Sequence, residues 1–197
     1  MEAAFKDIHQ DLIEACRNQN RHAQVRIYEL YFKALYNTCL RIVNNATETE
    51  DIMQESFLEA FKKIEDFRGE GSFGAWLKKI AVNNSINHLR KRREMVSFDE
   101  TIIEIKDTSP DEIEYSENIF CRLEEVRESL KKLPENYRIL ISLHLLEGYD
   151  HQEMAEIMKT THGNIRVKYL RAKQKLLQII MEGRAKNRNV GILESGN

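Results

Sequence analysis

The sequence has little of what interrupts helices and none of the long hydrophobic runs that cross membranes. Its 197 residues include only 8 Gly and 2 Pro. This scarcity, together with abundant Leu, Ile, Ala, Glu, Lys and Arg, favours helix throughout. No apolar stretch approaches the roughly 18 residues that a membrane span needs, and the polar segment from Met1 to Ile8 does not resemble a signal peptide. We therefore expect a cytoplasmic protein that does not insert into a membrane.

Cysteine is also scarce, and its spacing is unlike that of a metal or redox site. Cys16, Cys39 and Cys121 form no CxxC pair, so neither a zinc ligand set nor a thioredoxin-like motif is present, and buried, reduced thiols are expected. The histidines are scattered, and we expect surface or helix-cap positions for them: His9, His22, His88, His144, His151 and His162. Because phosphate-binding glycine loops and nucleophile motifs are also absent, the sequence predicts no enzyme, no cofactor and no metal.

The chain divides into two helical halves separated by an acidic segment. Apolar residues recur at helical spacing up to about Arg93 and again from about Cys121. Between residues 94 and 120 acidic residues dominate and the only base is Lys106, which is typical of a solvated linker. The prediction is an all-α protein with two small helical domains, residues 1–93 and 121–182, joined by the acidic linker 94–120. A flexible tail, 183–197, would follow.

A long apolar stripe marks the central helix of the first half. The residues at helical spacing that we expect to be buried are Ile27, Leu30, Tyr31, Ala34, Leu35, Thr38, Cys39 and Ile42. Asn44 and Asn45 are expected to end this helix. Thr47 or Thr49 is the expected N-cap of the next one.

The two helices that follow carry opposite charges. The first has an acidic surface, made by Glu48, Glu50, Asp51, Glu55 and Glu59, whereas no acidic residue interrupts the segment from Lys78 to Arg93. The net charge of −2 conceals this division. An acidic helix close to a basic one indicates that a basic protein partner docks on it.

The loop between these helices combines glycines with aromatic residues. Phe67, Phe73 and Trp76 lie within ten residues, and amides and cations follow them in the basic helix. Single-stranded nucleic acid is bound by such a combination, because bases stack on aromatic rings while cations hold the backbone. The alternative is that the three aromatic residues are simply core. Both interpretations can hold together, since a core aromatic residue can form the wall of a pocket.

The second half contains a helix-turn-helix pattern. Asp150 to Glu153 is a capping-box sequence that follows the helix stop at Gly148, and a short helix, a turn and a helix to about Met181 come next. The buried stripe of this last helix should be Ile165, Tyr169, Ala172, Leu176 and Ile180, and the opposite side should present Asn164, Val167, Lys168, Arg171 and Lys175. Such a helix suits the major groove of DNA. The alternative is a solvated amphipathic helix or a coiled-coil arm.

Together these segments resemble the extracytoplasmic-function sigma factors of bacterial RNA polymerase. The segment from Glu50 to Phe57, EDIMQESF, is similar to the family's segment that contacts the largest polymerase subunit. The resemblance implies contacts with core RNA polymerase by Asp51, Gln54 and Glu55. The segment that begins at Phe67-Arg68-Gly69 is similar to the one that melts and reads the −10 promoter element. It implies DNA contacts by Phe67, Arg68, Ser72, Phe73, Trp76, Lys79, Asn83, Asn87, Arg90 and Arg93.

The third similar segment begins at Leu133-Pro134 and resembles the family's reader of the −35 element. It implies DNA contacts by Thr161, Asn164, Arg166, Val167, Lys168, Arg171 and Lys175. Val167 stands where the family often has Ser, and Thr161-His162 also departs from the usual turn, so the promoter sequence is left open. The implied partners are core RNA polymerase, promoter DNA and an anti-sigma factor. The rival hypotheses are a helix-turn-helix regulator that works alone, and an RNA-binding or scaffold protein.

Overall fold

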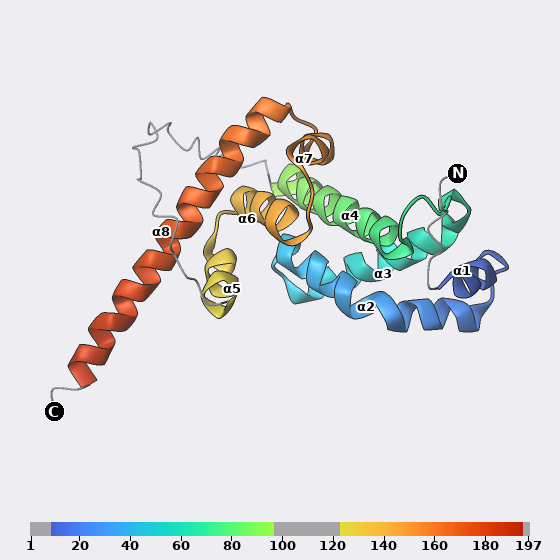
Figure 1. Ribbon diagram of the computed structural model, residues 1–197, viewed down its shortest axis with the longest axis horizontal. Helices are drawn as coiled ribbons and strands as arrows, with labels where there is room; N and C mark the ends of the chain where they lie inside the picture. Colours follow the sequence, from blue (N-terminus) through green and yellow to red (C-terminus); the bar gives the residue numbers. More distant parts are fainter. Residues whose placement is uncertain (1–8, 97–122, 195–197) are drawn as a thin grey trace, which may run out of the picture. The chain divides into compact units, whose positions relative to one another are not determined.

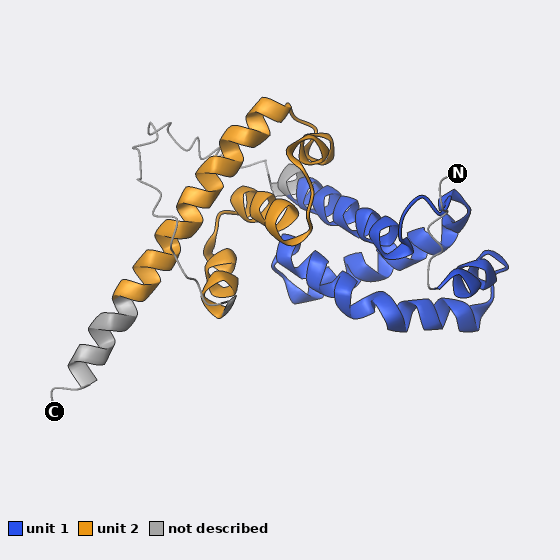
Figure 2. Ribbon diagram, in the orientation of Figure 1, with its two compact units in different colours: residues 1–99 blue, residues 100–197 orange. Residues whose placement is uncertain are grey.

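The computed structural model describes the backbone of residues 9–96 and 123–194, with side chains for residues 9–92 and 124–185. Every regular element in these ranges is a helix, which confirms the all-α prediction. The chain forms two compact units, residues 1–99 and 100–197 (Figure 2). Most of the predicted acidic linker, from residue 97 onward, lies outside the described residues, whereas its first three residues continue the last helix of unit 1.

Unit 1 is a bundle of four α-helices with one short 3₁₀ turn (Figure 1). Its elements are α1 (Gln10–Arg17), α2 (Arg21–Val43), α3 (Ala46–Lys62), the 3₁₀ turn η1 (Ile64–Asp66) and α4 (Phe73–Val96). The helices α2, α3 and α4 pack against one another, and α1 packs against α2 and η1. The core between them contains Ile27, Ile42, Ile52, Phe73 and Leu77, all essentially inaccessible to solvent.

The buried stripe of α2 is narrower than the sequence pattern predicts. Leu35, Cys39 and Ile42 are buried as expected, but Leu30 and Ala34 are exposed. These two residues lie at the edge of the stripe, beyond the faces that α1, α3 and α4 cover. Prediction from periodicity therefore located the stripe correctly and overestimated its width.

Asparagines, not threonines, form the junction between α2 and α3. Asn44 has the left-handed backbone conformation (φ 59°), and its N–H donates to the carbonyl of Leu40 at 2.8 Å, so it ends α2 as expected. Asn45 caps α3, because its side-chain oxygen accepts from the N–H of Glu48 at 3.1 Å. The prediction of Thr47 or Thr49 as the N-cap is therefore wrong. Thr49 is buried within the helix.

Unit 2 contains the helix-turn-helix. Its elements are α5 (Leu123–Lys132), α6 (Glu135–Ile141), the π-helical turn η2 (Ser142–Leu146), α7 (His151–Met158) and α8 (His162–Glu194). Gly148 adopts φ 80° after η2, where a left-handed residue ends the helix as predicted. Asp150 and Glu153 form the predicted capping box at the start of α7.

The buried face of α8 agrees with the predicted stripe at every position. Its five residues, Ile165, Tyr169, Ala172, Leu176 and Ile180, are all buried. The helix continues to Glu194, past the expected end near Met181. The only residue near that end that disfavours helix is Gly183, whose cost is about 1 kcal/mol relative to Ala. An ion pair between Arg184 and Glu125 of α5, at 2.8 Å, holds the start of this continuation.

Cys16 and Cys39 are buried and form no disulfide, and burial raises the pKa of the Cys16 thiol. Both therefore agree with the expected reduced thiols, whereas Cys121 lies outside the described residues. Among the helices that the structure describes, none combines the length and the apolar composition needed to cross a membrane.

We expect two glycine-to-alanine changes to have opposite effects on stability. A Cβ at Gly74, in the first turn of α4, would lie 2.9 Å from the ring of Tyr31, which packs against Phe73. Gly74→Ala should therefore destabilise the protein by about 1–3 kcal/mol. Gly183 has open space around it within α8, so Gly183→Ala should stabilise by up to about 1 kcal/mol. Thermal unfolding of both variants tests this, and equal effects would contradict it.

Candidate nucleic-acid and protein interfaces

The acidic residues of α3 lie on two different faces of the helix. Glu50, Asp51 and Glu55 are exposed to solvent together with Gln54. Glu48 and Glu59 instead turn toward α4. The three residues predicted to contact a protein partner, Asp51, Gln54 and Glu55, therefore all belong to the exposed set.

Glu59 and Glu48 connect α3 to α4 through polar contacts. Glu59 accepts from Asn84 at 2.9 Å and from Lys63 at 2.6 Å. The Lys63 hydrogen bond, followed by that from Asn84, holds the pKa of Glu59 below its usual value. Glu48 lies 2.8 Å from His88 Nε2 and 3.1 Å from an Arg92 nitrogen. The basic helix thus receives acidic partners from α3. The sequence pattern placed Glu48 and Glu59 on the acidic docking surface, which is wrong for these two, because the pattern does not show which face of α3 packs against α4.

The exposed face of α3 also carries an apolar residue that the sequence analysis missed. Leu58 is 61% exposed and lies one helical turn after Gln54 and Glu55 on the same side. On α2, the rings of Tyr28 and Phe32 stack at 5.8 Å and remain 37% and 43% exposed. Leu58, Tyr28 and Phe32 could have been found from the sequence, because they lie outside the buried stripes of their helices. An exposed Leu or aromatic residue beside charges often marks a protein contact.

The aromatic residues of the loop before α4 form a compact cluster. The ring centroids of Phe67, Phe73 and Trp76 are 5.4–5.6 Å apart. Phe67 and Phe73 are buried, and Trp76 is half-buried. For Phe67 and Phe73 the structure thus agrees with the core alternative, because buried rings have no face on which a base can stack. Trp76 keeps part of its ring accessible.

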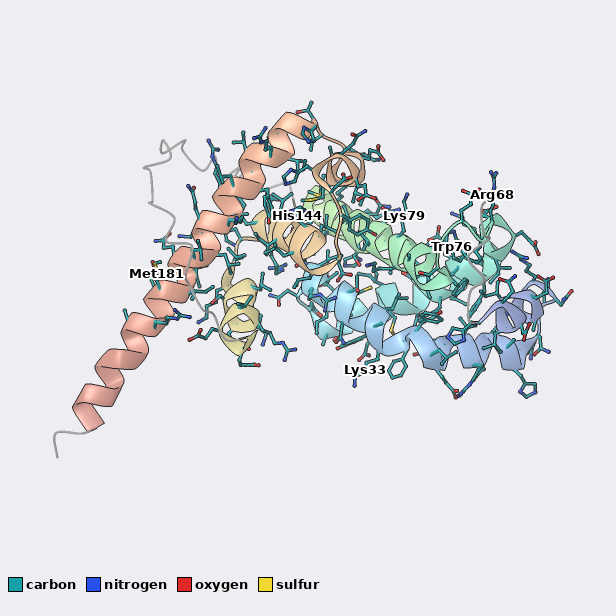
Figure 3. The ribbon with its side chains drawn as sticks, viewed as in Figure 1. Lys33, Arg68, Trp76, Lys79, His144 and Met181 are labelled. Carbon is teal, nitrogen blue, oxygen red and sulfur yellow. The ribbon has the colours of Figure 1, made fainter. Side chains whose placement is uncertain are left out.

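The polar residues of the loop point away from this cluster. Arg68 and Ser72 are exposed, and Figure 3 shows Arg68 at the end of unit 1, with Trp76 and Lys79 following along α4. Gly69 and Gly71 adopt φ values of 77° and 99°, which only glycine reaches without strain. The Ser72 hydroxyl accepts from the N–H of Ala75 at 3.2 Å and so caps α4.

The exposed face of α4 brings most of its predicted nucleic-acid contacts together. Lys79, Asn83 and Asn87 are exposed at intervals of four residues, and Arg90 lies one turn further. Arg90 donates to the Asn87 side chain at 3.4 Å. The Arg93 side chain lies outside the described residues. This face offers amides, which can read base edges, and cations, which can hold phosphates.

The N-terminal end of α8 presents the predicted duplex contacts. Asn164, Arg166, Val167 and Lys168 are exposed, with Val167 at 50%. Thr161 caps the helix, since its hydroxyl accepts from the N–H of Asn164 at 3.3 Å.

The last two predicted contacts of α8, Arg171 and Lys175, are half-buried. Lys175 donates to Gln178 at 3.1 Å. The polar face is therefore most accessible in the first two turns of the helix, which are the turns that reach base edges in helix-turn-helix proteins.

His144 and His151 pack against Tyr169, and His162 adjoins this cluster through His151. Ring centroids are 4.8 Å apart for His144 and His151, 4.6 Å for His144 and Tyr169, and 6.0 Å for His151 and His162. The prediction of separate surface or cap positions is therefore wrong for His144 and His151. No group of three His, Cys, Asp or Glu among the described residues is arranged to hold a metal ion. The cluster is an aromatic packing contact between η2, α7 and α8.

The cluster favours a neutral His151. Its Nε2 atom is buried and has no hydrogen-bond partner. Burial lowers the pKa of His151, and His144, His162 and Arg166 lower it further, while Asp150 opposes them. His144 lies 2.8 Å through Nδ1 from the Tyr149 carbonyl. Because a carbonyl only accepts, Nδ1 of His144 carries the hydrogen.

Comparison with known proteins identifies the family. Residues 27–95 match the family model for Sigma-70 region 2, and residues 123–176 match that for Sigma-70, region 4. The sigma-H factor of Pseudomonas aeruginosa is 29% identical over 174 residues, covering 84% of this chain and 90% of that protein. The ECF sigma-E factor of Salmonella typhimurium (strain LT2) is 34% identical over 136 residues, covering 64% of this chain and 71% of that protein.

Solved structures support the fold assignment. The sigma factor RpoE of Bartonella quintana, in complex with the anti-sigma factor NepR, has a TM-score of 0.54 and 22% identity, covering 79% of this chain and 95% of that chain. CnrH, in complex with the cytosolic domain of CnrY, has a TM-score of 0.52 and 21% identity, covering 87% of this chain and 96% of that chain.

The chain belongs to the sigma-70 family and, within it, to the ECF RNA polymerase sigma factors. Sigma factors are non-catalytic initiation factors, so membership confirms that the chain is not an enzyme.

The lowered pKa of His151 predicts a loss of stability on acidification. In the unfolded chain the His151 ring has its ordinary pKa of 6.5, whereas in the folded chain the ring binds a proton only at lower pH. The contribution of neutral His151 to the free energy of unfolding is therefore fully present above pH 6.5. It is lost as the pH falls from there toward the pKa of His151 in the folded protein. His151→Gln should reduce this pH dependence.

Thermal unfolding between pH 8 and 5.5 measures the pH dependence of stability, and an NMR titration of the histidine ring protons measures the pKa of His151. A His151 that titrates at or above 6.5 would contradict the prediction.

Proposed function

We propose that this sigma factor binds core RNA polymerase through the exposed face of α3 and reads promoters with one helix from each unit. The observation that carries the proposal is that the two matched sigma regions fall on two separate compact units. Each unit buries one face of a long helix and exposes amides and cations on another. On this basis residues 1–93 are the polymerase- and −10-binding domain, and residues 121–182 the −35-binding domain.

The polymerase contact would be made by Asp51, Gln54 and Glu55, with Leu58 beside them. Charge alone gives orientation and fast association more than affinity, so an exposed leucine at the end of an acidic face supports a specific protein contact. The acids that pair within unit 1, Glu48 and Glu59, are assigned to the fold and not to this surface.

The −10 contact would combine the loop tip with the exposed face of α4. Arg68 and Ser72 lie at the tip, Trp76 provides an accessible aromatic edge, and the rest of the face is formed by Lys79, Asn83, Asn87, Arg90 and Arg93. Phe67 and Phe73 would support this surface from below. An unpaired base held beside Trp76 would keep the promoter melted.

The −35 contact would use the first two turns of α8 for base edges and later cations for phosphates. Thr161, Asn164, Arg166 and Val167 form the first group, and Lys168, Arg171 and Lys175 the second. Two weak contacts on one polymerase-bound protein would then give strong combined binding.

Regulation by an anti-sigma factor is part of the proposal. The RpoE structure is a complex with the anti-sigma factor NepR, and CnrH was solved in complex with the cytosolic domain of CnrY, which supports a protein partner of this kind here. Because core polymerase and promoter DNA lie in the bacterial cytoplasm, we place the protein there as well.

The polymerase contact can be tested by co-purification with bacterial core RNA polymerase. We expect the wild type to co-purify stoichiometrically with the polymerase. The double variant Asp51→Arg/Gln54→Ala should not co-purify, because a reversed charge on the contact face repels a basic partner. Asp11→Arg makes the same charge change on an exposed residue of α1 and should bind as the wild type does. If no variant binds polymerase and the protein shifts duplex DNA alone, a helix-turn-helix regulator becomes the better account.

Val167 and Lys168 should affect −35 recognition in different ways. Val167→Ser should change the preferred base at one position, because a hydroxyl replaces an apolar contact. Lys168→Gln should weaken binding to all sequences and lower the slope of log affinity against log salt by about 1, as expected for one phosphate contact. Selection by the holoenzyme from a duplex pool randomised at −35, followed by salt titration, measures both effects. A sequence preference unchanged in Val167→Ser would contradict the assignment of that residue.

A further inference from the structure

We propose that Arg17 is a positioning residue for the −10 reading loop. It belongs to α1, outside the region-2 match that begins at residue 27, and lies 50 residues before the loop in the sequence. Its guanidinium donates to the backbone carbonyl of Phe67 at 2.7 Å. Phe67 is the last residue before the exposed loop tip, so this hydrogen bond fixes the point at which the loop leaves the core.

The geometry of the guanidinium fits this role. Another of its nitrogens pairs with Glu14 on the same helix at 2.9 Å, in an exposed ion pair that contributes little to holding the side chain. Nε is buried without a hydrogen-bond partner and lies 3.8 Å from Glu65 of η1. The hydrogen bond to Phe67 is charge-assisted and partly buried, which makes it stronger than a neutral one. Removal of Arg17 would leave the carbonyl of a buried residue without this donor.

The loop depends on its two ends because its middle is unsupported. Nothing lies within 4 Å of a Cβ built on Gly69 or Gly71, so no neighbouring element packs against the tip there. At the far end Ser72 caps α4. At the near end the restraints include the Phe67 ring, in its cluster with Phe73 and Trp76, and the hydrogen bond from the Phe67 N–H to the Ile64 carbonyl at 3.2 Å. The Arg17 hydrogen bond is the one restraint there that comes from α1. Arg17 therefore sets how Arg68 and the half-buried Trp76 are presented, without touching nucleic acid itself.

The role can be measured without DNA because Trp76 is the only tryptophan in the chain. In the full-length protein, Arg17→Ala should shift Trp76 emission and speed hydrogen exchange of the amides from Arg68 to Phe73. Arg17→Lys, which keeps the charge and a donor, should restore both in part. Glu14→Ala removes only the exposed ion pair and should leave both nearly unchanged. Hydrogen exchange of the α4 amides away from the loop should be the same in all variants.

The consequence for promoter recognition rests on the proposed function and is measured with the holoenzyme. Binding of a fluorescein-labelled single-stranded −10 oligonucleotide, taken from a promoter mapped with the reconstituted enzyme, should weaken about tenfold in Arg17→Ala. This factor corresponds to about 1.4 kcal/mol, within the range for an unpaired buried acceptor. Core polymerase and −35 duplex binding should not change, which a general loss of fold would not allow.

Two results would overturn the proposal, and a third would bear only on the function. If Trp76 emission and loop exchange in Arg17→Ala match those in Glu14→Ala, Arg17 does not position the loop. If exchange rises equally throughout unit 1 in both Arg17→Ala and Arg17→Lys, the residue is only structural. If the loop responds as expected but wild-type holoenzyme does not bind the oligonucleotide, the positioning role stands and the −10 assignment fails.

Discussion

The packing of α4 against α2 and α3 is the contact on which unit 1 depends, because it decides which face of α4 remains available. Phe73, Leu77 and Leu89 face the core, and Ala60 and Ala81 are fully buried where small side chains let helices approach closely. With that side fixed, the amides and cations assigned to the nucleic-acid face, such as Lys79, Asn83 and Asn87, lie on the solvent side. The same contact anchors the loop, since Phe73 is both the first residue of α4 and a member of the aromatic cluster. A core contact thus arranges the polar surface.

Polar contacts at two levels of α3 hold this arrangement in register. Glu48 binds the His88 and Arg92 side chains, and Glu59 binds Asn84, so the two acids connect to α4 three helical turns apart. The remaining acids of α3 are exposed. A single acidic helix therefore has an inner set of carboxylates that neutralises part of the basic helix and an outer set available to another protein. The division explains how opposite charges coexist in one small unit without collapse of the nucleic-acid face onto the acidic one.

Sequence patterns predicted the parts of the fold that depend on one helix and its own period. The buried stripe of α8, the stop at Gly148 and the capping box at Asp150 all follow from local spacing. Contacts between distant segments were not predictable in this way. The bonds from Glu48 to α4, the contacts of His144 and His151 with Tyr169, and the Arg17 hydrogen bond join residues 18 to 50 positions apart. The width of the α2 stripe also depends on neighbours, which is why Leu30 was placed wrongly.

The burial of Phe67 and Phe73 changes how the loop can work without removing its role. A loop that rests on packed rings loses less conformational entropy on binding than one that must order itself, so more of the contact energy becomes affinity. The exposed tip then needs only a few polar contacts and one accessible aromatic edge. In the proposed −35 contact the same argument would apply to α8, where Thr161 caps the first turn and the cations beyond it would supply binding that does not depend on sequence. On this proposal each unit would combine a preformed reading element with a salt-dependent one. Attachment of both units to one polymerase would make the second contact effectively intramolecular once the first has formed, so two modest contacts would give strong combined binding.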